Sequence, residues 1–277
     1  MDFKIALAGD LGSGKSTVAA LLSERTGAEI YSTGQICRAL AEKKGLPIDH
    51  FNIYMETHPE VDREIDDGLI ALSEKPGKLI IDSRMAWHFV SGCFSVYLST
   101  DPRVSAERIL SDNRSGECFS GVEEAMERIE ARRSSEDKRY YEKYGVRIKD
   151  MRSYDFVLDT THISPVRVAD EILRALAVHT EGRLSREARI SAGRIYYRPD
   201  DVQMDLLAGL RAELRMNAQI FIPTVTEKNG RYYLTGHPEA ALAYAVHGFD
   251  LLPCRIDDCP PTLPEGGYYP LTEFPHT

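Results

Sequence analysis

A glycine-rich loop near the N-terminus constrains this chain more than any other feature of its sequence. Residues 9–17 read Gly-Asp-Leu-Gly-Ser-Gly-Lys-Ser-Thr, between the apolar run 3–8 and the helix-forming run 18–22. This is the pattern G-x-x-x-x-G-K-[ST] in the strand–loop–helix setting that it requires. Glycines let backbone N–H groups close around phosphate oxygens, and the following helix points its positive end at the anion. The sequence therefore predicts a strand–loop–helix unit that binds a nucleoside triphosphate.

Within this loop the pattern assigns separate tasks to separate side chains. Lys15 is expected to reach the β- and γ-phosphates, and the Ser16 hydroxyl is expected to ligate magnesium. The predicted triphosphate-binding residues are Gly9, Gly12, Ser13, Gly14, Lys15, Ser16 and Thr17.

The composition of the chain limits the kinds of partner that it can bind. The net charge is −9, which argues against a broad nucleic-acid-binding surface because such surfaces carry a basic excess. No apolar run has the length of a membrane span, and the first residues lack the layout of a secretion signal. The five cysteines are too scattered to supply a zinc set. We therefore expect a cytoplasmic protein without nucleic-acid or membrane partners, either a monomer or a homodimer.

Strand and helix patterns alternate along residues 1–180, as in a parallel α/β sheet with both faces covered. The expected strands are 4–8, 29–31, 79–81, 94–98 and 156–158. The expected helices are 16–25, 33–43, 60–72, 103–110, 123–143 and 165–177. The sequence thus predicts a first domain over residues 1–180 that is built around this sheet.

The pattern changes after a polar linker near residue 183. A helix is expected over 202–216, then strands 220–225 and 231–234 around Asn229-Gly230, and a short helix over 239–247. Asn-Gly between two β-rich runs is a strong hairpin signal. Residues 184–277 are therefore predicted to form a smaller α+β domain.

Two groups of residues lie where an open α/β sheet binds its ligands, beyond the carboxyl ends of its strands. Ser32 follows the second strand and can cap the next helix, in which Arg38 lies. Asp82 and Arg84 follow the third strand: the acid suits a magnesium shell, and the arginine suits a phosphate. An exposed Arg38 and a surface ion pair between Asp82 and Arg84 are the alternatives.

A third group is the arginine-rich helix around residues 125–139. Arg128, Arg132 and Arg139 are spaced so that they share one helical face, whereas Glu130 and Glu136 are expected elsewhere on the helix. Arginines on one face suit a lid that neutralises a transferring phosphoryl group. The alternative is a solvated, charged helix.

In this order and spacing, the motifs resemble those of the short, archaeal-type cytidylate kinases of the nucleoside monophosphate kinase group. The similarity covers residues 1 to about 178. It rests on the glycine-rich loop, the run 32–40, Asp82–Arg84, and Lys138-Arg139-Tyr140 followed by Tyr144-Gly145. It implies a P-loop kinase fold with a five-stranded parallel sheet, a monophosphate-binding insertion and a lid.

The resemblance also implies an activity, which is ATP-dependent phosphorylation of a pyrimidine nucleoside monophosphate with Mg²⁺. Ser32 then lies near the acceptor base, Arg38 and Arg84 hold the acceptor phosphate, and Arg132 and Arg139 serve as lid arginines. With Lys15 and Asp82, these two lid arginines form the expected catalytic set, and Ser16 and Asp82 form the metal site. Ser83, Gln35 and Cys37 differ from the residues that are common in the family, so acceptors other than CMP stay open.

The C-terminal part resembles the ParB/sulfiredoxin-like fold through its hairpin, the Gly236-His237 turn and the helix that follows. Pro238 and Glu239 stand where arginines commonly follow that turn. A specificity or regulatory module, a dimerisation element and a second catalytic domain are its open roles. For the whole chain, a kinase of another phosphorylated metabolite and a non-catalytic nucleotide sensor are the alternatives to a nucleoside monophosphate kinase.

Overall fold

A single twisted sheet runs through the whole of the computed structural model, which describes residues 2–111, 121–182 and 186–274. Its strands are β1 (Phe3–Gly9), β2 (Glu29–Ser32), β3 (Lys78–Asp82), β4 (Phe94–Ser99), β5 (Phe156–Asp159), β6 (Glu187–Ser191), β7 (Ile195–Tyr197), β8 (Thr224–Lys228), β9 (Arg231–Gly236), β10 (Leu251–Ile256) and β11 (Tyr269–Pro270). Among the described residues their order is β11-β7-β9-β8-β10-β6-β5-β4-β1-β3-β2.

The five strands β2-β3-β1-β4-β5 are all parallel, as the sequence predicts. Side chains alternate between two apolar layers along β1. Ile5 and Leu7 pack with α1 (Lys15–Thr26) and α8 (Pro165–Thr180), whereas Ala6 and Ala8 face the opposite layer. Because both faces are covered, β1, β3, β4 and β5 read as nearly continuous apolar runs.

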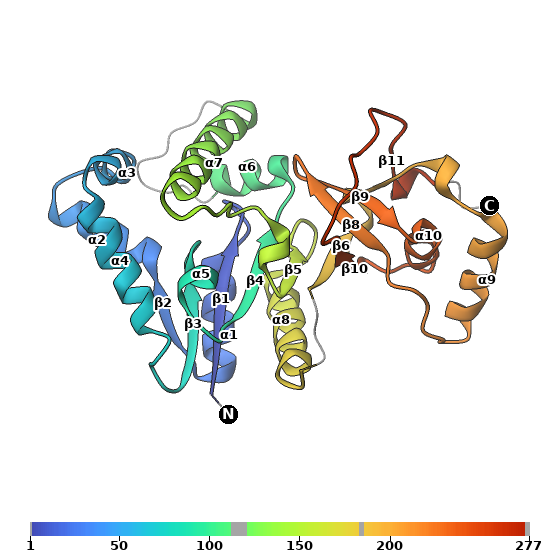
Figure 1. The fold of residues 1–277 in the computed structure, drawn as a ribbon, viewed down its shortest axis with the longest axis horizontal. Coiled ribbons are helices and arrows are strands. Elements are labelled where there is room, and N and C mark those ends of the chain that lie inside the picture. The colour runs from blue at the N-terminus through green and yellow to red at the C-terminus, as the bar shows by residue number, and fades with distance from the viewer. Residues whose placement is uncertain (1, 112–120, 183–185, 275–277) are drawn as a thin grey trace.

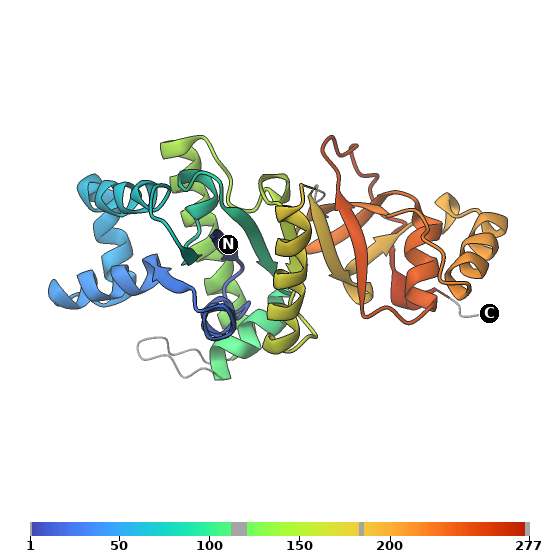
Figure 2. The same ribbon diagram turned by 90° about the horizontal axis from the view of Figure 1, so that it is seen from below.

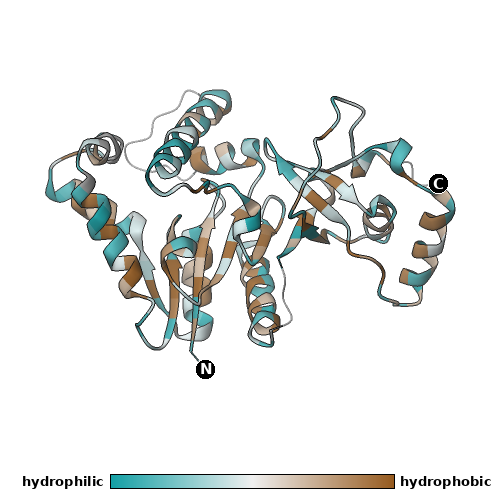
Figure 3. Ribbon diagram, viewed as in Figure 1, coloured by the Kyte–Doolittle hydropathy of each residue, from teal (hydrophilic) through white to brown (hydrophobic). Residues whose placement is uncertain are grey.

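The remaining helices are placed along this sheet and beyond it. They are α2 (Thr33–Lys43), α3 (Ile48–Thr57), α4 (Pro59–Ala71), α5 (Ala86–Phe89), α6 (Pro102–Ser111), α7 (Val122–Tyr144), α9 (Met204–Arg215) and α10 (Pro238–Val246). Figure 1 shows α7 lying across the carboxyl ends of the parallel strands. In Figure 3 much of α7 is hydrophilic, whereas the central strands are hydrophobic, as expected of a helix that covers a polar cleft.

The C-terminal strands extend the N-terminal sheet without a break. β6 pairs in parallel with β5, and β10 pairs antiparallel with β6. Figure 2 shows the C-terminal elements continuing the molecule sideways beyond α8. The hairpin predicted at Asn229-Gly230 is present as β8–β9. The division into two domains near residue 183, and the resemblance of the second to the ParB/sulfiredoxin-like fold, stay predictions.

A buried ion pair joins the two parts where the sheet crosses from one to the other. The Arg194 guanidinium lies 2.8 Å from the Asp159 carboxylate at the end of β5, and it also donates to Ser99 Oγ and to the Gly230 carbonyl. Tyr232 donates to Ser99 Oγ from the C-terminal side. Asp159 has no exposed surface and Arg194 is 5% exposed. The two parts therefore share a polar core as well as a sheet.

Some elements differ from the predictions. The strand expected over 220–225 begins only at Thr224, although the carbonyl oxygen of Pro223 still accepts a hydrogen bond from the Arg255 amide of β10. The helix α3 and the strands β6, β7, β10 and β11 were not expected from the sequence. No helix in the described ranges is long and apolar enough to cross a membrane.

Candidate active site

The phosphate loop joins β1 to α1 in a conformation that only glycine adopts without strain. Gly9 has a φ of 149° and Gly12 a φ of 72°. A Cβ atom on Gly9 would lie 2.4 Å from the Leu98 carbonyl oxygen, and one on Gly12 would lie 2.6 Å from the Ser105 carbonyl oxygen. Backbone on either side therefore excludes a side chain at both positions. The glycines hold the loop tightly against β4 and α6.

Lys15 begins α1, and its ammonium group folds back over the loop. Nζ donates to the carbonyl oxygens of Gly9 at 2.9 Å and Asp10 at 2.8 Å. Burial, together with the nearby Arg84 guanidinium, lowers the pKa of Lys15 to about 8. An ammonium group that is destabilised in this way gains from an anionic phosphate, which would restore its ordinary pKa. The Lys15 ammonium group therefore lies at the part of the loop that is expected to bind phosphate.

Asp82 ends β3 opposite the start of α1. Its Oδ2 accepts hydrogen bonds from Ser16 Oγ at 3.3 Å and from Ser32 Oγ at 3.4 Å. Ser32 Oγ also accepts a hydrogen bond from the Gln35 amide, so Ser32 caps α2 as predicted. Hydroxyl and carboxylate oxygens are the ligands that Mg²⁺ prefers, with substrate phosphates and water completing its shell. Ser16 and Asp82 therefore suit the expected metal.

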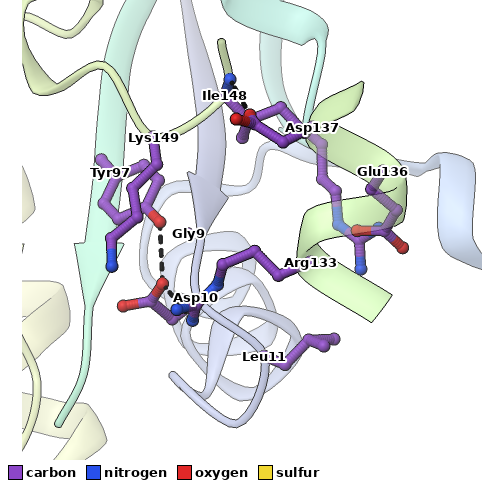
Figure 4. A pocket seen from close by; sticks show the side chains of 10 residues that line it. Gly9, Asp10, Leu11, Tyr97, Arg133, Glu136, Asp137, Ile148 and Lys149 are labelled. Atoms are coloured by element: carbon purple, nitrogen blue, oxygen red, sulfur yellow. Dashed lines mark hydrogen bonds and ion pairs between the residues drawn. The ribbon is translucent and has the colours of Figure 1, made fainter. Parts of the chain in front are cut away.

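Asp10 is a buried carboxylate in the phosphate loop that the sequence reasoning did not single out. It accepts hydrogen bonds from Tyr97 Oη at 2.8 Å and from the Thr100 amide at 2.9 Å, and Arg133 of α7 lies 2.8 Å away (Figure 4). Burial alone would raise the pKa of Asp10, but the charges of Arg133 and Lys149 outweigh it and hold the pKa below its ordinary value. Asp10 is therefore charged, and it ties α7 to the loop.

Glu136 corrects one expectation about α7. Instead of lying away from the arginine face, it forms an ion pair with Arg84 and accepts a hydrogen bond from Arg132 Nε at 3.2 Å. Burial opposes the charge of Glu136, yet Arg84 and Arg132 hold the pKa of its carboxyl below the ordinary value. Asp82 and Arg84 do not pair on the surface, because Arg84 turns towards α7.

The three arginines of the predicted stripe have different surroundings. Arg128 is exposed and pairs with Glu124 on its own helix. Arg132 meets Glu136, as described above. Arg139 donates to Tyr140 Oη, and its buried Nε has no hydrogen-bond partner among the described residues. That the three arginines act together as a lid stays a prediction.

Arg139, Arg84 and Arg38 all act electrostatically on Cys37 in α2. All three favour the charged form of the Cys37 thiol, although burial of the thiol is the larger effect and raises its pKa. Arg38 is exposed and lies against Gly34. The predicted acceptor arginines and one predicted lid arginine are therefore all near enough to Cys37 for their charges to act on it.

Arg133 and Glu136 were not predicted as site residues. The spacing of residues along a helix shows which of them share a face, but not which part of the protein that face contacts. With Tyr140 and Tyr144 they form an i, i+3, i+7, i+11 stripe, the face that α7 turns towards the sheet. Tyr144 donates to Asp66 of α4 at 2.5 Å at the far end of this face. The two tyrosines on this face were the sequence signal for the inward side of α7, whereas the number of arginines on the helix was not.

Comparison with known proteins finds relatives along the N-terminal part of the chain. Residues 5–118 match a protein-family model described as an AAA domain. A cytidylate kinase of Thermoplasma volcanium is 36% identical over 177 residues, which are 62% of this chain and 90% of that protein. A cytidylate kinase of Archaeoglobus fulgidus is 31% identical over 176 residues, 63% of this chain and 95% of that protein.

Two further similarities are to proteins that are not described as cytidylate kinases. An S-adenosylmethionine-dependent nucleotide dehydratase of Lacinutrix mariniflava is 34% identical over 174 residues, which cover 62% of this chain and 36% of that protein. Among solved structures, a shikimate kinase from Acinetobacter baumannii superposes with a TM-score of 0.43 at 19% identity, over 64% of this chain and 93% of that one.

Proposed function

The chain belongs to the archaeal-type cytidylate kinase family, and from that membership we propose that it transfers the γ-phosphate of ATP to a pyrimidine nucleoside monophosphate. One observation carries this proposal. The cleft beside the phosphate loop is lined by Gly9 and Asp10 from the loop, by Arg84 from the acceptor side, and by Arg133 from α7. Donor loop, acceptor arginine and covering helix therefore meet in one place, as phosphoryl transfer requires.

The donor side is formed by the loop and Lys15. Backbone N–H groups and the Lys15 ammonium bind the triphosphate, and Ser16 and Asp82 are the residues that would hold Mg²⁺. When bound, the metal ion neutralises phosphate charge and fixes the geometry of the oxygens. Arg108 of α6 donates to the carbonyl oxygens of Thr160 and Thr161 and thereby fixes the loop after β5 beside the phosphate loop.

The acceptor side is formed by Arg38, Arg84 and Arg139, with Ser32 at its edge. Guanidinium groups bind phosphate bidentately, so this cluster suits a substrate that already carries a phosphate. An acceptor phosphate oxygen held there is directed at the γ-phosphorus in line with the leaving oxygen. Because the transition state is loose, positioning and charge neutralisation supply the catalysis.

An ADP-release assay tests the proposal. The purified full chain with ATP and Mg²⁺ is offered CMP, dCMP, UMP, dTMP, AMP and base-modified pyrimidine monophosphates. We expect turnover with at least one pyrimidine monophosphate and the highest kcat/KM with CMP or dCMP. Bound ATP without turnover on any acceptor would favour the nucleotide sensor, and turnover on a phosphorylated non-nucleotide alone would favour the metabolite kinase.

Glu136 provides a second test, directed at the acceptor side. Glu136→Gln removes the charge that holds Arg84 and Arg132 together, so we expect KM for the acceptor to rise by about tenfold while KM for ATP changes little. The matched control is Glu142→Gln on the same helix, where Glu142 is exposed and pairs with Lys138. Steady-state kinetics with each substrate varied in turn provides the measurement. Equal changes in both KM values would contradict the assignment of Arg84 to the acceptor.

A further inference from the structure

Lys149 lines the cleft beside the phosphate loop, but the carboxylate that binds it belongs to the C-terminal part. Its Nζ lies 3.0 Å from Oε1 of Glu227, which is in β8. The two side chains are only 20% and 10% exposed. The same Glu227 oxygen accepts a hydrogen bond of 2.6 Å from the Gly230 amide, so the hairpin turn itself fixes the carboxylate. The C-terminal hairpin therefore reaches the edge of the cleft.

Four charges of alternating sign follow one another at this place. Arg133 of α7 pairs with Asp10 of the phosphate loop, and Lys149 lies near Asp10 (Figure 4). Glu227 in turn pairs with Lys149. The electrostatics agree with this order. The charge of Lys149 helps to lower the pKa of Asp10, and Glu227 helps to raise that of Arg133, where burial acts in the opposite sense. The charges of the four side chains sum to zero. Because each compensates a neighbour, the desolvation cost of burying any one of them is offset only when the others are present.

The position of Asp10 matters because its backbone takes part in the anion site. Its carbonyl oxygen accepts hydrogen bonds from Lys15 Nζ at 2.8 Å and from Ser13 Oγ at 2.7 Å. A small displacement of Asp10 would therefore move the lysine that meets the phosphates. Displacements of this kind are costly, because phosphoryl transfer depends on positioning.

We propose that the C-terminal hairpin β8–β9 acts on the triphosphate site through this chain of charges. Glu227 positions Lys149, and Lys149 and Arg133 together hold Asp10 and hence the loop. Glu227 and Lys149 are positioning residues, since they act through Asp10. The kinetic part of this inference rests on the proposed function, whereas its binding part requires only the triphosphate site.

The test is a cycle of variants in the full-length chain. Glu227→Gln keeps an amide oxygen for the Gly230 amide and removes the charge, and Lys149→Met removes the partner charge. We expect each variant to weaken ADP binding, measured by calorimetry, by about tenfold, and the double variant to be no weaker than either single one. Lys228→Met, which removes an exposed charge on the same hairpin, is the control and should bind like the parent chain.

A charge-swapped variant separates this role from simple docking of the hairpin. Lys149→Glu with Glu227→Lys rebuilds an ion pair between the two parts but places a carboxylate beside Asp10. We expect it to bind ADP at least as weakly as the single variants while its melting temperature stays near that of the parent. ADP binding restored by the swap, or unaffected by Glu227→Gln, would overturn the inference.

The kinetic arm uses the same variants. KM for ATP is expected to rise in parallel with the ADP dissociation constant, while KM for the acceptor stays near its original value, because the chain of charges ends at the donor loop. Equal changes in both would overturn the inference, since they indicate a general structural effect. If the parent chain phosphorylates no acceptor but the ADP cycle is non-additive, the proposed function fails and the coupling stands.

Discussion

Replacing Lys15 with alanine is expected to lower kcat for phosphoryl transfer by about a thousandfold. The ammonium is the one loop side chain expected to meet both the β- and γ-phosphates, and its charge is worth most where the transferring group gains negative charge. The structure adds that Lys15 is held over the loop by two carbonyl oxygens and repelled by Arg84, so it is poised to accept a phosphate. Single-turnover measurements of ADP formation at saturating ATP report this loss directly.

Lys43→Ala is the matched control, since Lys43 is an exposed lysine in the last turn of α2. It should leave kcat unchanged. Near-normal kcat in Lys15→Ala would contradict the kinase proposal itself. An unchanged melting temperature in Lys15→Ala is expected, because removing a buried ammonium group relieves desolvation as it removes two hydrogen bonds.

The parts of the fold that sequence reasoning predicted are those determined locally. The phosphate loop follows from glycine positions that backbone contacts require, at Gly9 and Gly12. The strands β1, β3, β4 and β5 follow because each is covered on both faces and is therefore an apolar run, whereas β2 at the edge of the sheet is partly exposed. The hairpin at Asn229-Gly230 follows from the backbone conformation that these two residues favour.

The parts that were missed depend on partners far away in the sequence. β6 and β10 pair with each other and with β5, and their short patterns gain meaning only from that pairing. Arg133 and Glu136 lie on a helix with charges all round, so their inward direction depends on Asp10 and Arg84. Arg194 looks like any surface arginine in the sequence, and only the buried carboxylate at the end of β5 accounts for its position.

Replacing Arg194 with methionine is expected to destabilise the protein by about 3–5 kcal/mol, because Asp159 would be left as an unpaired charge without solvent. Asp159 also accepts hydrogen bonds from the amides of Thr161 and Ser191, so it cannot turn away. Chemical denaturation of both chains at pH 7 measures the difference. Arg174→Met is the control: Arg174 is 63% exposed and pairs with Glu171 on its own helix, so its loss should cost little.

The pH dependence of the stability difference distinguishes loss of this ion pair from simple loss of packing. In the parent chain, burial opposes the charge of Asp159, but Arg194, together with the hydrogen bonds from Thr161 and Ser191, outweighs it and holds the pKa below its ordinary value. That stabilisation is present above the unfolded-state pKa of about 4 and is lost as the pH falls through the lower folded-state value. Without Arg194, burial raises the pKa of Asp159, so the variant gains stability as the pH falls from 7 towards 4. The difference in the free energy of unfolding between the two chains should therefore become smaller on acidification. The double variant Arg194→Met with Asp159→Asn should recover much of the stability that Arg194→Met loses at pH 7. A difference that is independent of pH would show that Asp159 is not the charge that Arg194 compensates.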